Sequence, residues 1–307
     1  MNEHKKEHRP VAVVVDSTCD TSAPLRPRLR TVPLTVNFDG EEFLDGVTIT
    51  TRQFYEKLIE SDALPTTSQP SPAAFAAVFR EEIAAGRDVL VVTVSSQLSG
   101  THQSAVLAAE EFPGRVFVVD STNAAIGAGV LAELALRLVD EGLGAAGIAA
   151  RLEREREDIR LIALLDTLEY LHKGGRLSRT AALAGGMLSI KPVVHLKDGA
   201  IELLGKARGS RRANNLLLRE IEAAGGVDFD RPLLLGYTGL SDLLLQKYIE
   251  DSAPLWQDHR GALPVTEIGS AIGTHAGPGA IAVAFFRRGR GRAGGCVDGE
   301  GWGSVVG

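Results

Sequence analysis

Three short apolar runs near the N-terminus constrain the fold more than any other feature of this sequence. They cover Val11–Val15, Val89–Val94 and Val116–Val119, and they are rich in β-branched residues with almost no polar interruption. Such runs are typical of strands that are buried on both faces of a parallel sheet. Each run is followed by a helical pattern. This alternation predicts an α/β unit whose parallel sheet carries helices on both faces.

The helical patterns give approximate bounds for these helices. We expect them at Ala73–Ala85, directly after Pro72, at Gln103–Glu111 and at Ala124–Glu141. The last of these contains two glycines, Gly127 and Gly129, which weaken the helical pattern in its first turns.

Beyond about residue 160 the pattern changes to antiparallel pairing. Leu161–Leu165 is typical of a strand, and Pro192–Leu196 with Ala200–Leu204 predicts a hairpin around an Asp-Gly turn. Further elements are expected at 210–224 (helix), 233–237 (strand), 241–252 (helix), 265–268 (strand) and 280–286 (strand). We therefore predict an N-terminal α/β domain over 10–165, a C-terminal α/β domain with a mixed or antiparallel sheet over 166–288, and a disordered Gly/Arg-rich tail over 289–307.

Bulk properties narrow the range of functions. A chain of 307 residues is long enough for two domains, so two cores with a cleft between them are expected. The net charge of −6 argues against general binding of nucleic acid. The two cysteines, Cys19 and Cys296, are too far apart in sequence to indicate a zinc knuckle or a disulfide framework. No segment approaches the ~20 apolar residues of a membrane span, and the N-terminus lacks a signal-peptide pattern, so we expect a cytoplasmic protein.

Hydroxyl-rich loops follow all three N-terminal strands. They are Asp16–Thr18, Ser95–Thr101 and Asp120–Asn123. In open α/β sheets ligands bind at the carboxyl ends of the strands, where helix N-termini also offer N–H groups to an anion. The same residue types are common N-caps of helices. The sequence leaves open whether these loops form a shared polar site or only cap helices.

Three further segments combine cations or hydroxyls with glycine or proline. Pro65–Pro72 is a stiff, hydroxyl-rich loop that suits a carboxylate, or else a turn with an N-cap. Leu171–Ser178 places two glycines beside Arg176, which lets an anion approach closely, although Gly174 is also typical of a helix C-cap. Lys206–Arg212 is either a solvated charge run or a patch for a phosphate-bearing partner.

Gly273–Gly279 surrounds His275 with glycines and a proline. We interpret it as a loop, because these residues disfavour both helix and strand, with a constrained backbone around the histidine. A loop histidine is often only a polar surface group, but its near-neutral pKa suits a position beside an acid or a phosphate. Motifs of P-loop kinases, nicotinamide enzymes, α/β-hydrolases and zinc proteases are absent, and no metal site is indicated.

The ordered set of motifs resembles the DegV family. The matching segments are DSTCD, TSQPS, SSQLSGT, the DST after the third strand, LEYLHKGGRLS, the IKP with its Asp-Gly hairpin, KARGSRRA and GTHAGPG, and they run from about Val11 to Phe286. Cys19 in the first motif, Gly209 after KAR, and the Gly/Arg-rich tail depart from the family pattern.

The resemblance implies a two-domain fold that holds one long-chain fatty acid between its domains. It implies a non-catalytic subunit without a cofactor, which presents the fatty-acid carboxylate to a separate ATP-binding kinase subunit of the dihydroxyacetone-kinase-like type. By the same resemblance, Thr67, Ser99 and the amide of Gly100 would hold the carboxylate, and Arg176 would support them. Arg208 and His275 would face the kinase and the phosphate, His275 also beside the carboxylate. Contact with a membrane would be only transient.

Two other functions are compatible with the residues. A serine hydrolase would use Ser95 or Ser99 with His275 and with Asp16 or Asp120. A lipid sensor would bind its ligand without a kinase partner.

Overall fold

A four-stranded parallel sheet forms the N-terminal part of the protein. The structure is a computed structural model that describes residues 9–61, 63–177, 190–256, 259, 261 and 263–288. The strand order is β2 (Leu29–Val32), β1 (Val11–Asp16), β6 (Asp88–Thr93) and β7 (Val116–Asp120), and every neighbouring pair is parallel. The three predicted strands are thus confirmed. The edge strand β2 was not predicted, because its four residues, Leu-Arg-Thr-Val, have two polar residues in the middle and form no apolar run.

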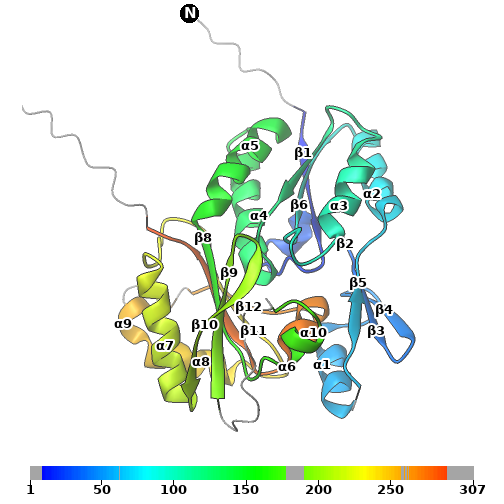
Figure 1. The fold of residues 1–307 in the computed structure, drawn as a ribbon. Helices are drawn as coiled ribbons and strands as arrows, with labels where there is room; N and C mark the ends of the chain where they lie inside the picture. The colour runs from blue at the N-terminus through cyan, green and yellow to red at the C-terminus, as the bar shows by residue number, and fades with distance from the viewer. Residues whose placement is uncertain are drawn as a thin grey trace, which may run out of the picture.

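Helices cover both faces of this sheet, as predicted. Figure 1 shows α2 and α3 on one side of β1 and β6, and α4 and α5 on the other. Their bounds are α2 (Pro72–Ala84), α3 (Thr101–Ala109), α4 (Ala125–Asp140) and α5 (Ala145–Glu155). The hydroxyl of Ser71 accepts a hydrogen bond from the Ala74 N–H, so the N-cap interpretation of this segment is confirmed.

A six-stranded mixed sheet forms most of the C-terminal part. Its order is β10 (Ala200–Arg208), β9 (Ile190–Lys197), β8 (Ile159–Leu164), β13 (Ile281–Phe286), β11 (Leu233–Tyr237) and β12 (Val265–Glu267), with only β11 and β12 parallel. Asp198 and Gly199 join β9 to β10 and both have positive φ, as the predicted Asp-Gly hairpin requires. The outer face is covered by α7 (Ser210–Ala223), α8 (Leu243–Asp251) and α9 (Ala253–Trp256).

Helix α4 lies between the two sheets and contacts both of them. One cluster of buried side chains therefore includes Val13 and Leu90 of the first sheet together with Leu161 and Ala282 of the second. The expected separation into two cores is wrong at this position, because a single apolar helix serves both sheets. The predicted domain limits stay a prediction.

A small antiparallel sheet was not predicted. It consists of β4 (Glu41–Leu44), β3 (Thr35–Phe38) and β5 (Thr66–Ser68), and it packs against α1 (Thr51–Glu60) and α10 (Ser270–Ala276). Strands of three or four residues leave little periodicity to recognise. Helix α1 has a capping box formed by Thr50 and Gln53, which is a signal that the sequence does contain.

The interpretation of Gly273–Gly279 as a loop is wrong for its first residues. His275 lies on helix α10, which ends at Gly277 with φ of +70°. Position 273 requires glycine although it lies within the helix, because α1 packs closely against it: a Cβ there would lie 2.6 Å from the Tyr55 hydroxyl oxygen. Gly277 and the following proline therefore end the helix, while Gly273 permits close packing.

The remaining short elements are α6 (Glu169–Lys173) and two 3-10 helices, η1 (Arg26–Arg28) and η2 (Arg156–Asp158). Within the part of the chain that the structure describes, no helix combines the length and apolar character that crossing a bilayer requires. The predicted tail over 289–307, with Cys296, lies outside the described residues.

Replacing Gly129 by alanine tests the packing of α4. Its Cβ would lie 1.9 Å from the backbone oxygen of Asp20, so the helix must shift, and we expect a loss of about 1–3 kcal/mol in unfolding free energy. Gly147→Ala is the matched control, because Gly147 lies in helix α5 with open space around it; there we expect a gain of about 0.5–1 kcal/mol. Denaturant titration measures both changes. Equal effects would contradict the close packing at α4.

Candidate functional site

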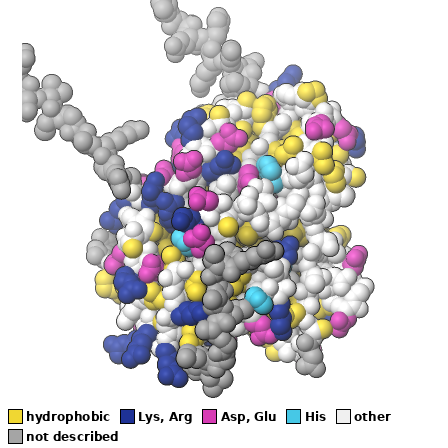
Figure 2. Space-filling model, viewed as in Figure 1, with side chains coloured by type: hydrophobic (Ala, Val, Ile, Leu, Met, Phe, Trp, Pro, Cys, Tyr) yellow, Lys and Arg dark blue, Asp and Glu magenta, His cyan; other side chains and the backbone are white. Residues whose placement is uncertain are grey.

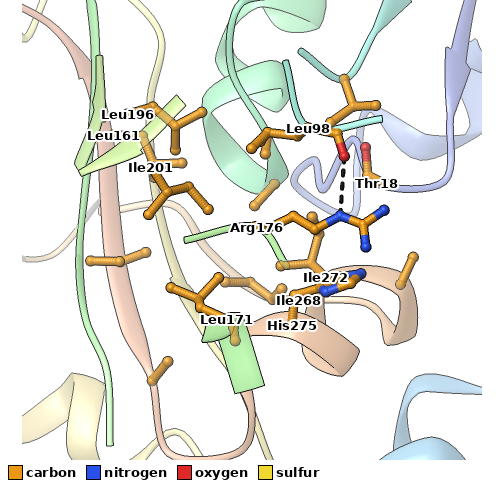
Figure 3. A pocket seen from close by; sticks show the side chains of 18 of the residues that line it. Thr18, Leu98, Leu161, Leu171, Arg176, Leu196, Ile201, Ile268, Ile272 and His275 are labelled. Carbon is orange, nitrogen blue, oxygen red and sulfur yellow. Dashed lines mark hydrogen bonds between the residues drawn. The ribbon is translucent and has the colours of Figure 1, made fainter. Parts of the chain in front are cut away.

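A mostly apolar cavity lies between the loops of the first sheet and the inner face of the second. Its walls include Leu161 of β8, Leu196 of β9 and Ile201 of β10 (Figure 3). Ala163 of β8 and Ala282 of β13 also line it. Seven of the lining residues are alanines, whose small side chains leave room between the sheets. The empty space of the cavity, including open solvent at its mouth, is about 920 Å³.

Polar side chains from separate segments meet in this cavity. Thr67 comes from β5, Ser99 from the loop after β6, Arg176 from the segment after α6, and His275 from α10; all four line the cavity. Figure 3 shows Arg176 and His275 together with Thr18 on one side, and Leu161, Leu196 and Ile201 on the other. The cavity therefore has a polar end and an apolar end.

The same polar end opens toward the surface. A second depression shares Thr67, Arg176 and His275 with the inner cavity and is also lined by Tyr170 and Lys173. These three shared residues therefore stand between the apolar cavity and an outer, more polar depression.

Arg176 connects two of the segments at the polar end. Its Nη1 donates to the Gly174 carbonyl oxygen at 2.6 Å, and its Nε donates to the Leu98 carbonyl oxygen at 3.2 Å, the bond drawn in Figure 3. Gly174 is the C-cap of α6, as one interpretation of the sequence held. It also makes room for His275, because a Cβ at this position would lie 2.4 Å from the His275 Nδ1 atom.

His275 is held in a neutral state. Burial and, as the smaller cause, the positive charge of Arg176 together lower the pKa of its imidazole to about 4. Its Nε2 lies 2.9 Å from the Thr67 hydroxyl, and its buried Nδ1 has no partner among the described residues. The local charge at the polar end thus comes from Arg176, which favours an anionic group.

Two of the six predicted site residues lie apart from this group. Gly100 is the N-cap of α3 beside Ser99 but does not line the cavity; a Cβ there would lie 2.1 Å from Gln69 Oε1. Arg208 is exposed at the end of β10, paired with Ile190, and is also absent from the lining.

The hydroxyl-rich loops mainly bond to one another. Asp16 accepts hydrogen bonds from the backbone N–H groups of Thr18 and Val94, and its burial raises its pKa. The N-caps of α3 and α4 are Gly100 and Ala124, without side-chain caps, so helix capping does not explain these loops. Thr18 lines the cavity and was missed, although it belongs to one of the three loops that the sequence singled out.

The residues of a serine hydrolase are not assembled. The Ser95 hydroxyl donates to the Gly199 carbonyl oxygen, the Ser99 hydroxyl lies 2.8 Å from that of Thr101, and His275 bonds to Thr67. In the described ranges no group of three or more His, Cys, Asp or Glu side chains could hold a metal ion.

The partly buried His275 imidazole predicts a specific loss of stability in acid. Its folded-state pKa of about 4 lies below the ordinary 6.5, so between these values the unfolded chain binds a proton that the folded protein does not. Stability should therefore fall as the pH drops from about 6.5 to about 4 and lose no more from this group below that. In His275→Asn this part of the slope should vanish, whereas the exposed His172→Asn should retain it. Urea unfolding at several pH values measures the slopes; identical slopes would refute the assignment.

Comparison with known proteins agrees with the fold. The family model described as "Uncharacterised protein, DegV family" matches residues 10–288. A DegV domain-containing protein of Caldanaerobacter subterraneus is 36% identical over 90% of this chain and 98% of its own length. Among solved structures, a fatty-acid-binding DegV family protein of Thermus thermophilus has a TM-score of 0.78 at 37% identity, covering 90% of this chain and 99% of its own. A stearic-acid-binding protein of Eubacterium ventriosum has a TM-score of 0.79 at 28% identity, covering 90% and 98%. The chain therefore belongs to the DegV family.

Proposed function

We propose that this protein binds one long-chain fatty acid and presents its carboxylate for phosphorylation by a separate ATP-dependent kinase subunit. One observation carries the binding proposal: a mostly apolar cavity is lined at one end by Thr67, Ser99, Arg176 and His275. The acyl chain would lie along β8, β9 and β13, with the carboxylate at the polar end. The fatty-acid ligands of the solved relatives support the same assignment.

The apolar part of the cavity supplies the affinity. Each buried methylene contributes about 0.8 kcal/mol, so a chain of about 16 carbons gives on the order of 12 kcal/mol before the cost of ordering it. The small alanine side chains keep this space open, and the leucines and isoleucines along the walls would contact the acyl chain.

The polar end supplies the orientation. A carboxylate that leaves water needs donors, because an unpaired buried charge costs several kcal/mol. The hydroxyls of Thr67 and Ser99 and the guanidinium of Arg176 are such donors, with the Gly100 amide next to Ser99. A neutral His275 can donate one hydrogen bond. Because it carries no positive charge, it needs no second anion beside it.

The kinase partner is the finer part of the proposal. Its support is the family resemblance together with the polar depression that reaches Thr67, Arg176 and His275 from outside. Four exposed cations surround the end of β10 and the start of α7: Lys206, Arg208, Arg211 and Arg212. Figure 2 shows Lys and Arg side chains gathered at the lower left, where these elements lie. We assign Arg208 to this partner surface. The protein would act in the cytoplasm, meet membranes only transiently, and need no cofactor of its own.

Fatty-acid retention tests the binding proposal. Native mass spectrometry should show a co-purified fatty acid on the wild-type protein. Thr67→Ala and Ser99→Ala each remove one donor, and we expect each to weaken binding about tenfold. Ser71→Ala is the matched control for Thr67→Ala. It removes a hydroxyl from the same segment, Pro65–Pro72, and this hydroxyl only caps α2. Protein that is always recovered empty and binds no added palmitate or oleate would contradict the proposal.

Formation of acyl phosphate tests the kinase partner. With ATP and a kinase subunit added, hydroxylamine should trap acyl phosphate from the loaded wild-type protein. Arg208→Ala should retain the fatty acid and lower the rate of phosphorylation, while Arg219→Ala, at an exposed arginine further along α7, should match wild type. No trapped product from any loaded protein would favour the lipid-sensor function.

A further inference from the structure

A buried carboxyl group holds the N-terminus of the helix that carries His275. The two oxygens of Asp45 accept hydrogen bonds from the Ser270 and Ala271 N–H groups, each at 3.2 Å. Asp45 is 5% exposed, and burial raises its pKa. Without its N–H partners, a carboxylate at this position would cost free energy by leaving water. Asp45 contacts these two neighbouring residues although more than 200 positions separate it from them in the sequence.

The other end of the same helix forms the polar end of the cavity. His275 lies four residues after Ala271, which is about 6 Å along a helix. Its imidazole bonds to Thr67, and Ala271, Ile272 and Ala276 of the same helix line the cavity. Any shift or rotation of α10 therefore changes the contact between His275 and Thr67.

Asp45 and Thr67 belong to the same structural unit. The Asp45 N–H donates to the Leu34 carbonyl oxygen just before β3, and Val36 of β3 pairs with Thr67 of β5. The small sheet thus contacts α10 at both ends, with Asp45 at the first turn and Thr67 at the last.

Packing between these two ends leaves the helix little freedom. The Tyr55 hydroxyl donates to the Ile268 carbonyl oxygen at 2.9 Å, directly before α10. The rings of Phe54 and Tyr55 approach Gly273 so closely that even a methyl group would not fit. The helix is therefore held at its start by Asp45, in its middle by the aromatic side chains of α1 and at its end by Thr67.

We infer that Asp45 is a positioning residue of the carboxylate site: by holding the first turn of α10, it sets the orientation of His275 and, through His275, that of the Thr67 hydroxyl. This inference rests on the proposed function, because Thr67 is assigned there as a carboxylate ligand. Asp20 accepts from Gly269 N–H at 2.8 Å beside Asp45 but belongs to the loop after β1, so it joins α10 to the first sheet and not to Thr67.

A double-mutant cycle on fatty-acid affinity tests the inference. Asp45→Ala should weaken binding of a fluorescent fatty acid about tenfold. The double variant with Thr67→Ala should bind no more weakly than Thr67→Ala alone, because both changes act through one hydroxyl. The control cycle pairs Asp45→Ala with Ser99→Ala. Because α10 does not hold the loop that contains Ser99, the losses of affinity from these two changes should multiply. Asp45→Asn keeps one acceptor oxygen, so it should restore part of the affinity.

A second measurement needs no ligand. NMR titration of His275 in ligand-free protein should give a pKa closer to 6.5 in Asp45→Ala than in wild type, because a displaced imidazole is better solvated. If the wild type binds no fatty acid, the proposed function fails while this titration still decides the positioning role. Should Asp45→Ala not fold, Asp45→Asn provides both measurements. Multiplicative effects with Thr67→Ala, or an unchanged His275 titration in a variant that only melts earlier, would overturn the inference.

Discussion

The burial of α4 between the two sheets is the constraint on which the rest of the structure depends. The helix contacts β1 and β6 on one side and β8, β11 and β13 on the other, so it fixes the distance between the sheets. Gly129 permits α4 to approach the loop after β1 closely, since a Cβ there would lie 1.9 Å from the backbone oxygen of Asp20. Ala124 and Ala125 at the start of α4 line the cavity. The apolar cavity is therefore a consequence of how this helix separates the sheets.

The polar end of the cavity depends on contacts between segments that are distant in sequence. Arg176 bonds to the loop that contains Ser99, and His275 bonds to the strand that contains Thr67. Gly174 brings these two pairs together, because its lack of a side chain lets His275 approach the end of α6. A positive guanidinium beside a neutral imidazole and two hydroxyls is a suitable environment for one carboxylate and a poor one for a cation.

Much of the fold could be predicted from local patterns. The buried strands of the first sheet and the Asp-Gly hairpin have strong signals, since both depend on residues that are neighbours in sequence. The small sheet could not be predicted in this way, because β3, β4 and β5 are short and lack an apolar run. Helix α10 was missed for a related reason: Gly273 suggests a loop until its contact with Tyr55 is known.

The residues of the site could be predicted only in part from the sequence. Loops at the carboxyl ends of the strands pointed to Ser99 on physical grounds, whereas the grouping of Thr67, Arg176 and His275 followed from the family resemblance. The role of Asp45 at α10 requires the tertiary structure, since a single acidic residue after a short strand carries no signal of its own.

The most direct measurement is a crystal structure of the protein with a bound fatty acid of about 16 carbons. The account predicts a carboxylate within hydrogen-bond distance of the Thr67 and Ser99 hydroxyls, next to Arg176, with the acyl chain passing toward Leu161 and Leu196. A fatty acid bound at another position, or one whose carboxylate lies at the Leu161 end, would contradict it.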